Sequence, residues 1–143
     1  MFSASHRLHS DAMSAEENTA TYGKCNNPHG HGHNYALEVM VSGPVDESTG
    51  MVCNLIDLDG FVHQEILERF DHQNLNTLEE FAKVVPTTEN LCIAIYDILQ
   101  RGFRQAHLEK VRFEETMMNS FEYAGGSGGA LTTETTEGTE ENR

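Results

Sequence analysis

The chain has 143 residues, of which 38% are hydrophobic, and a formal net charge of −14 at pH 7. This length suits one compact domain. The acidic balance argues against a nucleic-acid partner, which needs a basic face, and no apolar run approaches the ~20 residues that span a bilayer. The amino end lacks a secretory-signal pattern, and three cysteines without C-x-x-C spacing argue against a disulfide framework. We therefore expect a cytoplasmic protein.

In chain order, the first expected element is a strand that runs into residues 3–5 and is cut short by the amino end. Polar and apolar residues alternate over 33–41, which predicts a strand with one buried face. Apolar residues then recur every four positions from 58 to 70, which predicts an amphipathic helix. Gly60 weakens the start of that helix.

A second helix is expected after Pro86, where Thr87 or Thr88 can provide the cap, and it ends near Gly102. Alternation over 111–116 predicts a further strand, and a last strand holds residues 121 and 123. Helices on one face of a four-stranded antiparallel sheet make an α+β domain. Such a sheet leaves exposed edges, which pairing between subunits can cover.

The last stretch, residues 125–143, is rich in Gly, Thr and Glu and buries too little apolar surface to offset its ordering entropy. We expect it to be disordered. The predicted domain therefore spans residues 1–124.

The histidines are concentrated in the tract HGHGH at residues 29–33. Alternate residues of a strand share a face, so His31 and His33 point the same way and make half of a zinc site. His6 is the natural third ligand, and three histidines leave the fourth position open, as in catalytic zinc sites. His29 is a competing ligand, and the alternative is a tract that chelates metal weakly or does nothing. Three further histidines are interpreted as surface residues: His9, His63 and His107.

Cys25 lies in a Gly- and Asn-rich loop after Lys24, and a neighbouring cation lowers the pKa of a thiol. This context leaves a reactive thiol and an ordinary cysteine as equal alternatives. The dipeptide Asp71-His72 follows the first helix, and a carboxylate beside an imidazole raises its basicity. Neighbours in sequence often point apart, so the dipeptide alone is a weak signal.

Glu115 falls on the same strand face as Val111 and Phe113, where a lone carboxylate is costly. A ligand with an amidine-like pair of N–H groups would satisfy it through two parallel hydrogen bonds. The alternative is a frayed strand end at which the carboxylate reaches water.

Six motifs occur in a fixed order: FSASH at 2–6, GKCNN at 23–27, GHGHNY at 30–35, DHxNL at 71–75, TTEN at 87–90 and ET at 115–116. In this combination the chain resembles the 6-pyruvoyl-tetrahydropterin synthase family over residues 1 to 123. The resemblance implies the tunnelling fold: a four-stranded antiparallel sheet, its first strand shortened here, with two helices on one face. It also implies trimers that join their sheets into a barrel, and homohexamers with active sites at subunit interfaces.

By position, the resemblance implies that His6, His31 and His33 bind one Zn²⁺ per subunit. It assigns Cys25 as the general base and Asp71 with His72 as a second proton-handling group. Glu115 would anchor the pterin ring, with additional contacts from two residues of the second helix: Thr87 and Thr88.

The implied reaction converts 7,8-dihydroneopterin triphosphate into 6-pyruvoyl-tetrahydropterin and inorganic triphosphate, in tetrahydrobiopterin biosynthesis. An acidic chain must hold the triphosphate with local cations, for which Arg7 and Lys24 are candidates, with Mg²⁺ on the phosphates. Two alternatives stay open. One is the related 6-carboxy-tetrahydropterin synthase, and the other is an inactive relative that only binds metal or pterin.

Overall fold

The structure, a computed structural model, describes residues 1–28, 30–115, 119–125 and 131–135, the last range by its backbone alone. Its strands are β1 (Phe2–His6), β2 (His31–Ser42), β3 (Gln73–Asn74), β4 (His107–Glu115), β5 (Asn119–Tyr123) and β6 (Leu131–Thr135). Its α-helices are α1 (Ala15–Tyr22), α2 (Leu55–Val62), α3 (Glu68–Phe70) and α4 (Thr88–Gly102). The shorter turns are the 3-10 segments η1 (Gly23–Asn26), η3 (Leu75–Thr77) and η4 (Glu79–Phe81), and the π-helical η2 (His63–Leu67).

Within these ranges the strands form one six-stranded sheet in the order β3-β1-β2-β4-β5-β6. All neighbours are antiparallel except β1 and β3, which form a short parallel pair. β1 pairs with β2 over its whole length, from Phe2 opposite Tyr35 to His6 opposite His31. The short first strand therefore sets the register that brings these two histidines side by side.

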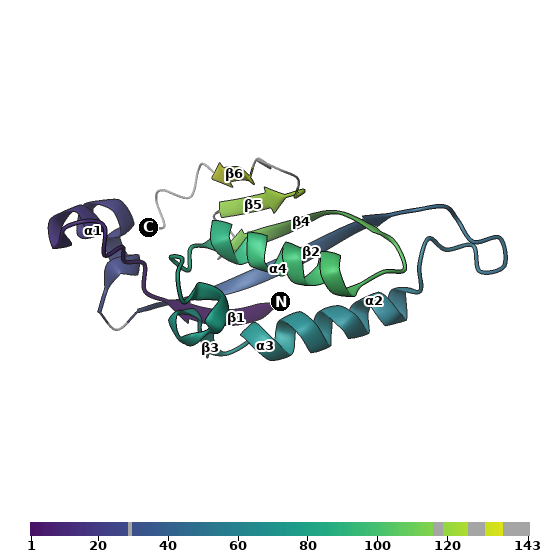
Figure 1. The fold of residues 1–143 in the computed structure, drawn as a ribbon, viewed down its shortest axis with the longest axis horizontal. Helices are drawn as coiled ribbons and strands as arrows, with labels where there is room; N and C mark the ends of the chain where they lie inside the picture. Colours follow the sequence, from purple (N-terminus) through teal and green to yellow (C-terminus); the bar gives the residue numbers. More distant parts are fainter. Residues whose placement is uncertain (29, 116–118, 126–130, 136–143) are drawn as a thin grey trace, which may run out of the picture.

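The helices α4 and α2–α3 lie on one face of the sheet (Figure 1). Alternate residues of the strands face them, because side chains in a strand point to opposite faces. The core under these helices combines strand residues with the apolar stripes of the helices, and its fully buried members include Val111, Phe113, Ile66, Phe70, Leu91, Ile95 and Leu99. Each such side chain contributes roughly 1.5–3 kcal/mol by its removal from water.

The two predicted helices are confirmed, and both begin at side-chain caps. Asn54 caps α2 by accepting a hydrogen bond from the Ile56 backbone N–H, 2.9 Å away. Thr87, one of the two predicted caps, accepts from the Asn90 N–H at 3.1 Å and so begins α4. The first helix starts three residues earlier than its apolar repeat indicated, and the π-helical η2 joins α2 to α3 without a break.

The α+β class is observed, but the sheet differs from the expected four antiparallel strands. β3 adds a parallel edge and β6 pairs with β5 in the segment for which disorder was expected. The sequence analysis also missed α1, which projects at one end of the molecule (Figure 1). The rest of the expected tail, residues 126–130 and 136–143, lies outside the described residues, and the oligomeric barrel stays a prediction.

No helix in the described part of the chain combines the length and apolar character that crossing a membrane requires.

Candidate metal centre and active site

The three predicted metal ligands come from two paired strand ends. His6 is the last residue of β1 and lies directly opposite His31, the first residue of β2, while His33 lies diagonally across. Gly30, just before β2, has φ 82°, and a Cβ there would lie 3.1 Å from the His6 carbonyl oxygen. Glycine therefore permits the close approach of the two strand ends.

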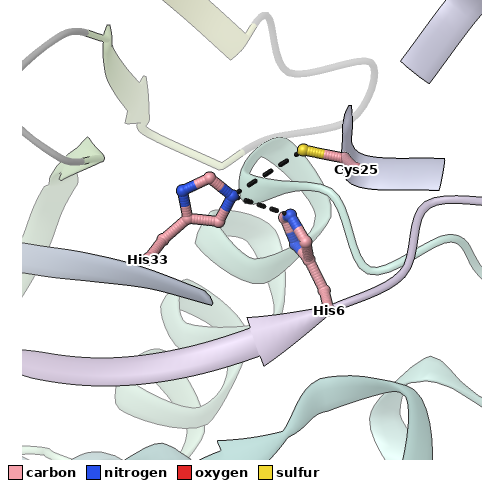
Figure 2. A group of neighbouring side chains, drawn as sticks. All are labelled: His6, Cys25 and His33. Atoms are coloured by element: carbon pink, nitrogen blue, oxygen red, sulfur yellow. Dashed lines mark hydrogen bonds between the residues drawn. The ribbon is translucent and has the colours of Figure 1, made fainter. Parts of the chain in front are cut away.

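His6 and His33 point toward each other, as Figure 2 shows, and their Nε2 atoms are 3.0 Å apart. Each ring has an acceptor at its other nitrogen. The Nδ1 of His6 lies 2.8 Å from the Pro86 carbonyl oxygen, to which it donates, and the Nδ1 of His33 lies 3.0 Å from a carboxylate oxygen of Glu115. These acceptors fix the tautomer in which both Nε2 atoms carry lone pairs.

Burial keeps both rings neutral at pH 7. It lowers the pKa of His6 to about 4, assisted by the neighbouring His33 ring. It lowers the pKa of His33 to about 4 as well, with a further contribution from His31. Neutral imidazole is the form that binds metal.

Cys25 completes a group of atoms that could bind a metal, from His6, Cys25 and His33, which all lie within 4.8 Å of one another. Its Sγ is 3.8 Å from the His33 Nε2. Burial raises the pKa of the Cys25 thiol, and the Glu115 carboxylate raises it further. The expected lowering by Lys24 is therefore wrong for the protein without a metal.

This donor set fits a divalent zinc ion. The lone pairs of the two Nε2 atoms repel each other unless a proton or a cation lies between them. Each neutral ring carries its single proton on Nδ1, so no proton lies there at neutral pH. Tetrahedral Zn²⁺ with Zn–N near 2.05 Å places two nitrogens about 3.3 Å apart, and a sulfur at 2.3 Å lies about 3.5 Å from each. The observed 3.0 and 3.8 Å are close to these separations.

His31 is exposed, and its ring lies edge-to-face on that of His33, with centroids 4.7 Å apart. The ring nitrogens of His31 are not part of the group formed by His6, Cys25 and His33. The register nevertheless places it directly across from His6, on the same sheet face. The predicted competitor His29 lies outside the described residues.

Glu115 faces inward, and its side chain is 13% exposed. This placement excludes the alternative of a frayed strand end. One carboxylate oxygen contacts His33, and the other accepts a hydrogen bond from the buried Thr88 hydroxyl. Since each carboxylate oxygen has two lone pairs, both can still accept from a ligand. Thr87 is half-buried, and its hydroxyl accepts the capping bond of α4.

Asp71 and His72 do contact each other: the His72 Nδ1 is 3.2 Å from the Asp71 carboxylate. His72 has φ 59°, in the left-handed region, and its ring is largely exposed. It lines an open groove of about 510 Å³ over β1, β2 and β3. No hydrogen bond or ion pair among the described residues joins Asp71 or His72 to Cys25.

Of the remaining predicted surface histidines, His63 and His107 are exposed, while His9 is half-buried and bonds to Asn26. Arg7, a predicted phosphate cation, donates from Nε to the Asn26 carbonyl at 3.2 Å. The sequence analysis missed the Pro86 carbonyl, which orients His6. A backbone acceptor carries no side-chain signal, although Pro86 itself marked the helix start.

The chain is similar to a known protein family over most of its length. The family model for 6-pyruvoyl tetrahydropterin synthase matches residues 1–126. The chain is 49% identical over 125 residues to the 6-pyruvoyl tetrahydrobiopterin synthase of Homo sapiens, covering 87% of this chain and 86% of the relative. It is 36% identical to a putative 6-carboxy-5,6,7,8-tetrahydropterin synthase of Archaeoglobus fulgidus, covering 74% and 84%.

A solved structure has a similar fold. The Caenorhabditis elegans 6-pyruvoyl tetrahydropterin synthase superposes with a TM-score of 0.82 at 43% identity, covering 87% of this chain and 90% of that one. Sequence and fold therefore agree over nearly the whole of the predicted domain. The chain belongs to the 6-pyruvoyl tetrahydropterin synthase family.

Proposed function

We propose that the chain is a zinc-dependent lyase that converts 7,8-dihydroneopterin triphosphate into 6-pyruvoyl-tetrahydropterin and releases triphosphate. The observation that carries the proposal is the pair of neutral imidazoles whose Nε2 atoms face each other beside the Cys25 thiol. The names of the relatives supply the substrate class.

His6, His31 and His33 would hold the zinc ion, one per subunit. The facing nitrogens of His6 and His33 support two of these assignments, and the register opposite His6 supports the third. Bound zinc would polarise the side-chain hydroxyls of the substrate and stabilise the thiolate of Cys25. A second ligand set, with Cys25 in place of His31, is favoured by the convergence of the three ligand atoms.

Cys25 is proposed as the general base. Its sulfur lies beside the ligand nitrogens, so a substrate side chain bound there presents its C–H groups to the thiol. Burial raises the pKa of this thiol in the metal-free protein, and bound zinc would lower it again.

Glu115 is proposed to anchor the pterin ring. The amidine-like edge of a pterin presents two parallel N–H donors, and the remaining carboxylate lone pairs accept them. The Thr88 hydroxyl holds the carboxylate in place from the helix side. Thr87, at the start of the same helix, would contribute a contact at the rim of the ring.

Asp71 and His72 are proposed to move the second proton, with Asp71 orienting the imidazole. Their lack of contact with Cys25 within the described part of one chain is explained if each site combines residues of two copies. We propose a homohexamer of two trimers, with sites at the interfaces between subunits. His72 of one copy would then face the thiol of its neighbour.

Arg7 and Lys24 are proposed to hold the triphosphate, with Mg²⁺ bound to its oxygens. All three cysteines are free. Free thiols are typical of a reducing compartment, which supports the proposed cytoplasmic location.

Metal analysis paired with a triphosphate-release assay tests the proposal. We expect one zinc per subunit and release of triphosphate from 7,8-dihydroneopterin triphosphate, both lost after treatment with a chelator and restored by Zn²⁺. Folded, zinc-loaded protein that releases no triphosphate would contradict the proposed activity and favour a binding protein. The mass of the product separates the pyruvoyl reaction from the carboxy alternative, whose named relative is less similar to this chain.

A further inference from the structure

The segment 71–76 runs alongside β1 and contacts both of its ends. At one end, the Asp71 carboxylate accepts a hydrogen bond from the Ser3 backbone N–H at 2.9 Å, and the His72 N–H donates to the Ser3 carbonyl. β3 then pairs with the middle of β1 in parallel. The segment therefore follows the strand that carries the metal ligand His6 from its first residues to its last.

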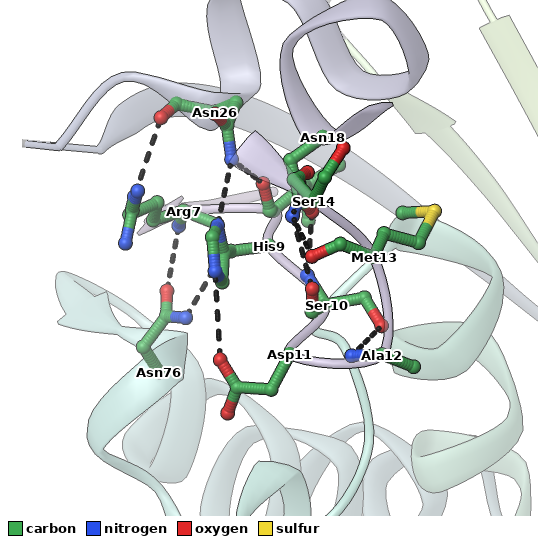
Figure 3. A network of polar contacts seen from close by, with 11 residues as sticks. Arg7, His9, Ser10, Asp11, Ala12, Met13, Ser14, Asn18, Asn26 and Asn76 are labelled. Atoms are coloured by element: carbon green, nitrogen blue, oxygen red, sulfur yellow. Dashed lines mark hydrogen bonds and ion pairs between the residues drawn. The ribbon is translucent and has the colours of Figure 1, made fainter. Parts of the chain in front are cut away.

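At the other end, the Asn76 carboxamide holds the peptide groups of Arg7, the residue after His6 (Figure 3). Its Oδ1 accepts from the Arg7 N–H at 2.6 Å, and its Nδ2 donates to the Arg7 carbonyl at 2.8 Å. One side chain thus satisfies both backbone groups of the residue that follows β1.

The strand end is also tied to the loop of Cys25. The Leu8 N–H donates to the Cys25 carbonyl at 2.7 Å, and the Asn26 side chain donates to the Leu8 carbonyl at 2.7 Å. The Arg7 guanidinium reaches the Asn26 carbonyl. Arg7 and Leu8 consequently link the backbone of His6 to that of Cys25. Asn76 holds this link from the side of the Asp71-His72 turn.

We propose that Asn76 is a positioning residue of the metal centre. It fixes the strand end that carries His6 and, through its own segment, the distance from that strand end to the Asp71-His72 turn. This inference rests on the proposed function, because it assigns a role toward the zinc ion and the reaction. Asn76 touches neither, so its effect is on the geometry of the site and not on its composition.

Competition between metal-free protein and a coloured chelator for Zn²⁺ tests the proposal. Partners that orient metal ligands typically contribute 10–100-fold in metal affinity, so we expect Asn76→Ala to weaken zinc binding about tenfold. It should also lower kcat, while the affinity for neopterin, which lacks the triphosphate and is anchored by Glu115, should change little. Asn76→Asp keeps the acceptor for the Arg7 N–H and loses the donor, so its zinc affinity should be intermediate.

Asn54→Ala is the matched control, because it removes an asparagine cap at the start of α2, at the other end of the domain from the metal centre. It should lose comparable thermal stability and keep the wild-type zinc affinity. Equal zinc affinities in Asn76→Ala and Asn54→Ala would overturn the role of Asn76 while the proposed function stands. If Asn76→Ala does not fold, the zinc affinity of Asn76→Asp is compared with that of Asn54→Ala instead, and equal affinities would again overturn the role of Asn76. A wild-type protein that binds no zinc would overturn the proposed function itself.

Discussion

The Nδ1 of His33 lies 3.0 Å from the carboxylate of Glu115, so the residue proposed to anchor the pterin also orients a proposed zinc ligand. A carboxylate at the far nitrogen of a metal-bound imidazole raises its basicity and fixes its orientation. The proposed metal site and the proposed pterin site would therefore be joined through one side chain.

Substitution of Glu115 should affect both sites. We expect Glu115→Ala to weaken zinc binding by about 10–100-fold and neopterin binding by a similar factor, because it removes the acceptor of His33 and the charged acceptor of the ring. Glu115→Gln keeps an oxygen for His33, so it should retain most of the zinc affinity while losing neopterin affinity.

Glu114→Ala is the control for this pair, since Glu114 lies next in sequence and contacts Arg112 instead of the metal centre. Zinc and neopterin titrations of the purified variants measure both effects. Unchanged neopterin affinity in Glu115→Ala and Glu115→Gln would show that the ring is anchored elsewhere.

Much of the fold was predictable because the strands and helices of the core have strong periodicity. The strand over 33–41 was predicted from its alternation, and β2 extends it by two residues at the start and one at the end. The helix after Pro86 was predicted from its cap and its apolar stripe, and α4 begins and ends where they indicated. β3 was not predicted because a strand of two residues is too short to show an alternating pattern. Its pairing with β1 also depends on contacts between residues distant in sequence. α1 was missed because its exposed surface lacks an apolar stripe.

For the site, the sequence indicated which side chains take part and which strand face they share, but not how separate segments of the chain meet. Alternation placed His31 and His33 on one face, and the inward direction of Glu115 followed from the same pattern. The proximity of Cys25 to His33 could not follow from spacing, because it depends on how η1 folds back onto the strand end. Burial, which determines the pKa of this thiol, is likewise a property of the folded chain.

The metal-free protein should lose stability as the pH falls from about 6.5 to 4. In that window the unfolded chain protonates its histidines, while His6 and His33 stay neutral in the folded state. The unfolded state binds more protons in this window. The two histidines therefore make their full contribution to the free energy of unfolding above pH 6.5, and this contribution decreases as the pH falls. Across the whole window the lowered pKa of His6 corresponds to a loss of roughly 3 kcal/mol.

Urea unfolding at pH 7.5 and pH 5 measures this dependence. His33→Gln should reduce it, while His63→Gln, at an exposed position, should leave it as in the wild type. A midpoint that does not change with pH would contradict the neutral, buried state of the two rings. Zinc should stay bound to the folded protein through most of this window and dissociate only near pH 4, where protons begin to compete for the ligand nitrogens.

The third zinc ligand can be identified by paired substitutions. If His31 is the ligand and Cys25 the base, His31→Ala should lose most of its zinc, and Cys25→Ala should keep about one zinc per subunit while losing most turnover. The opposite pattern, with zinc lost from Cys25→Ala and kept by His31→Ala, would assign the sulfur as a ligand. Metal analysis of dialysed variants measures this, with His107→Ala as a control for an exposed histidine.

Mixing two inactive variants tests whether each site combines two copies. Cys25→Ala and His72→Ala should each be inactive alone, since each lacks one proposed proton-handling group. When they are unfolded together and refolded as mixed oligomers, about a quarter of the sites should receive both intact residues from different copies, by random assortment. Cys25→Ala mixed with Glu115→Ala is the control, because Cys25 and Glu115 both adjoin the same His33 ring and belong to one copy's site. That mixture should stay inactive, and recovery in neither mixture would mean that His72 does not act across an interface.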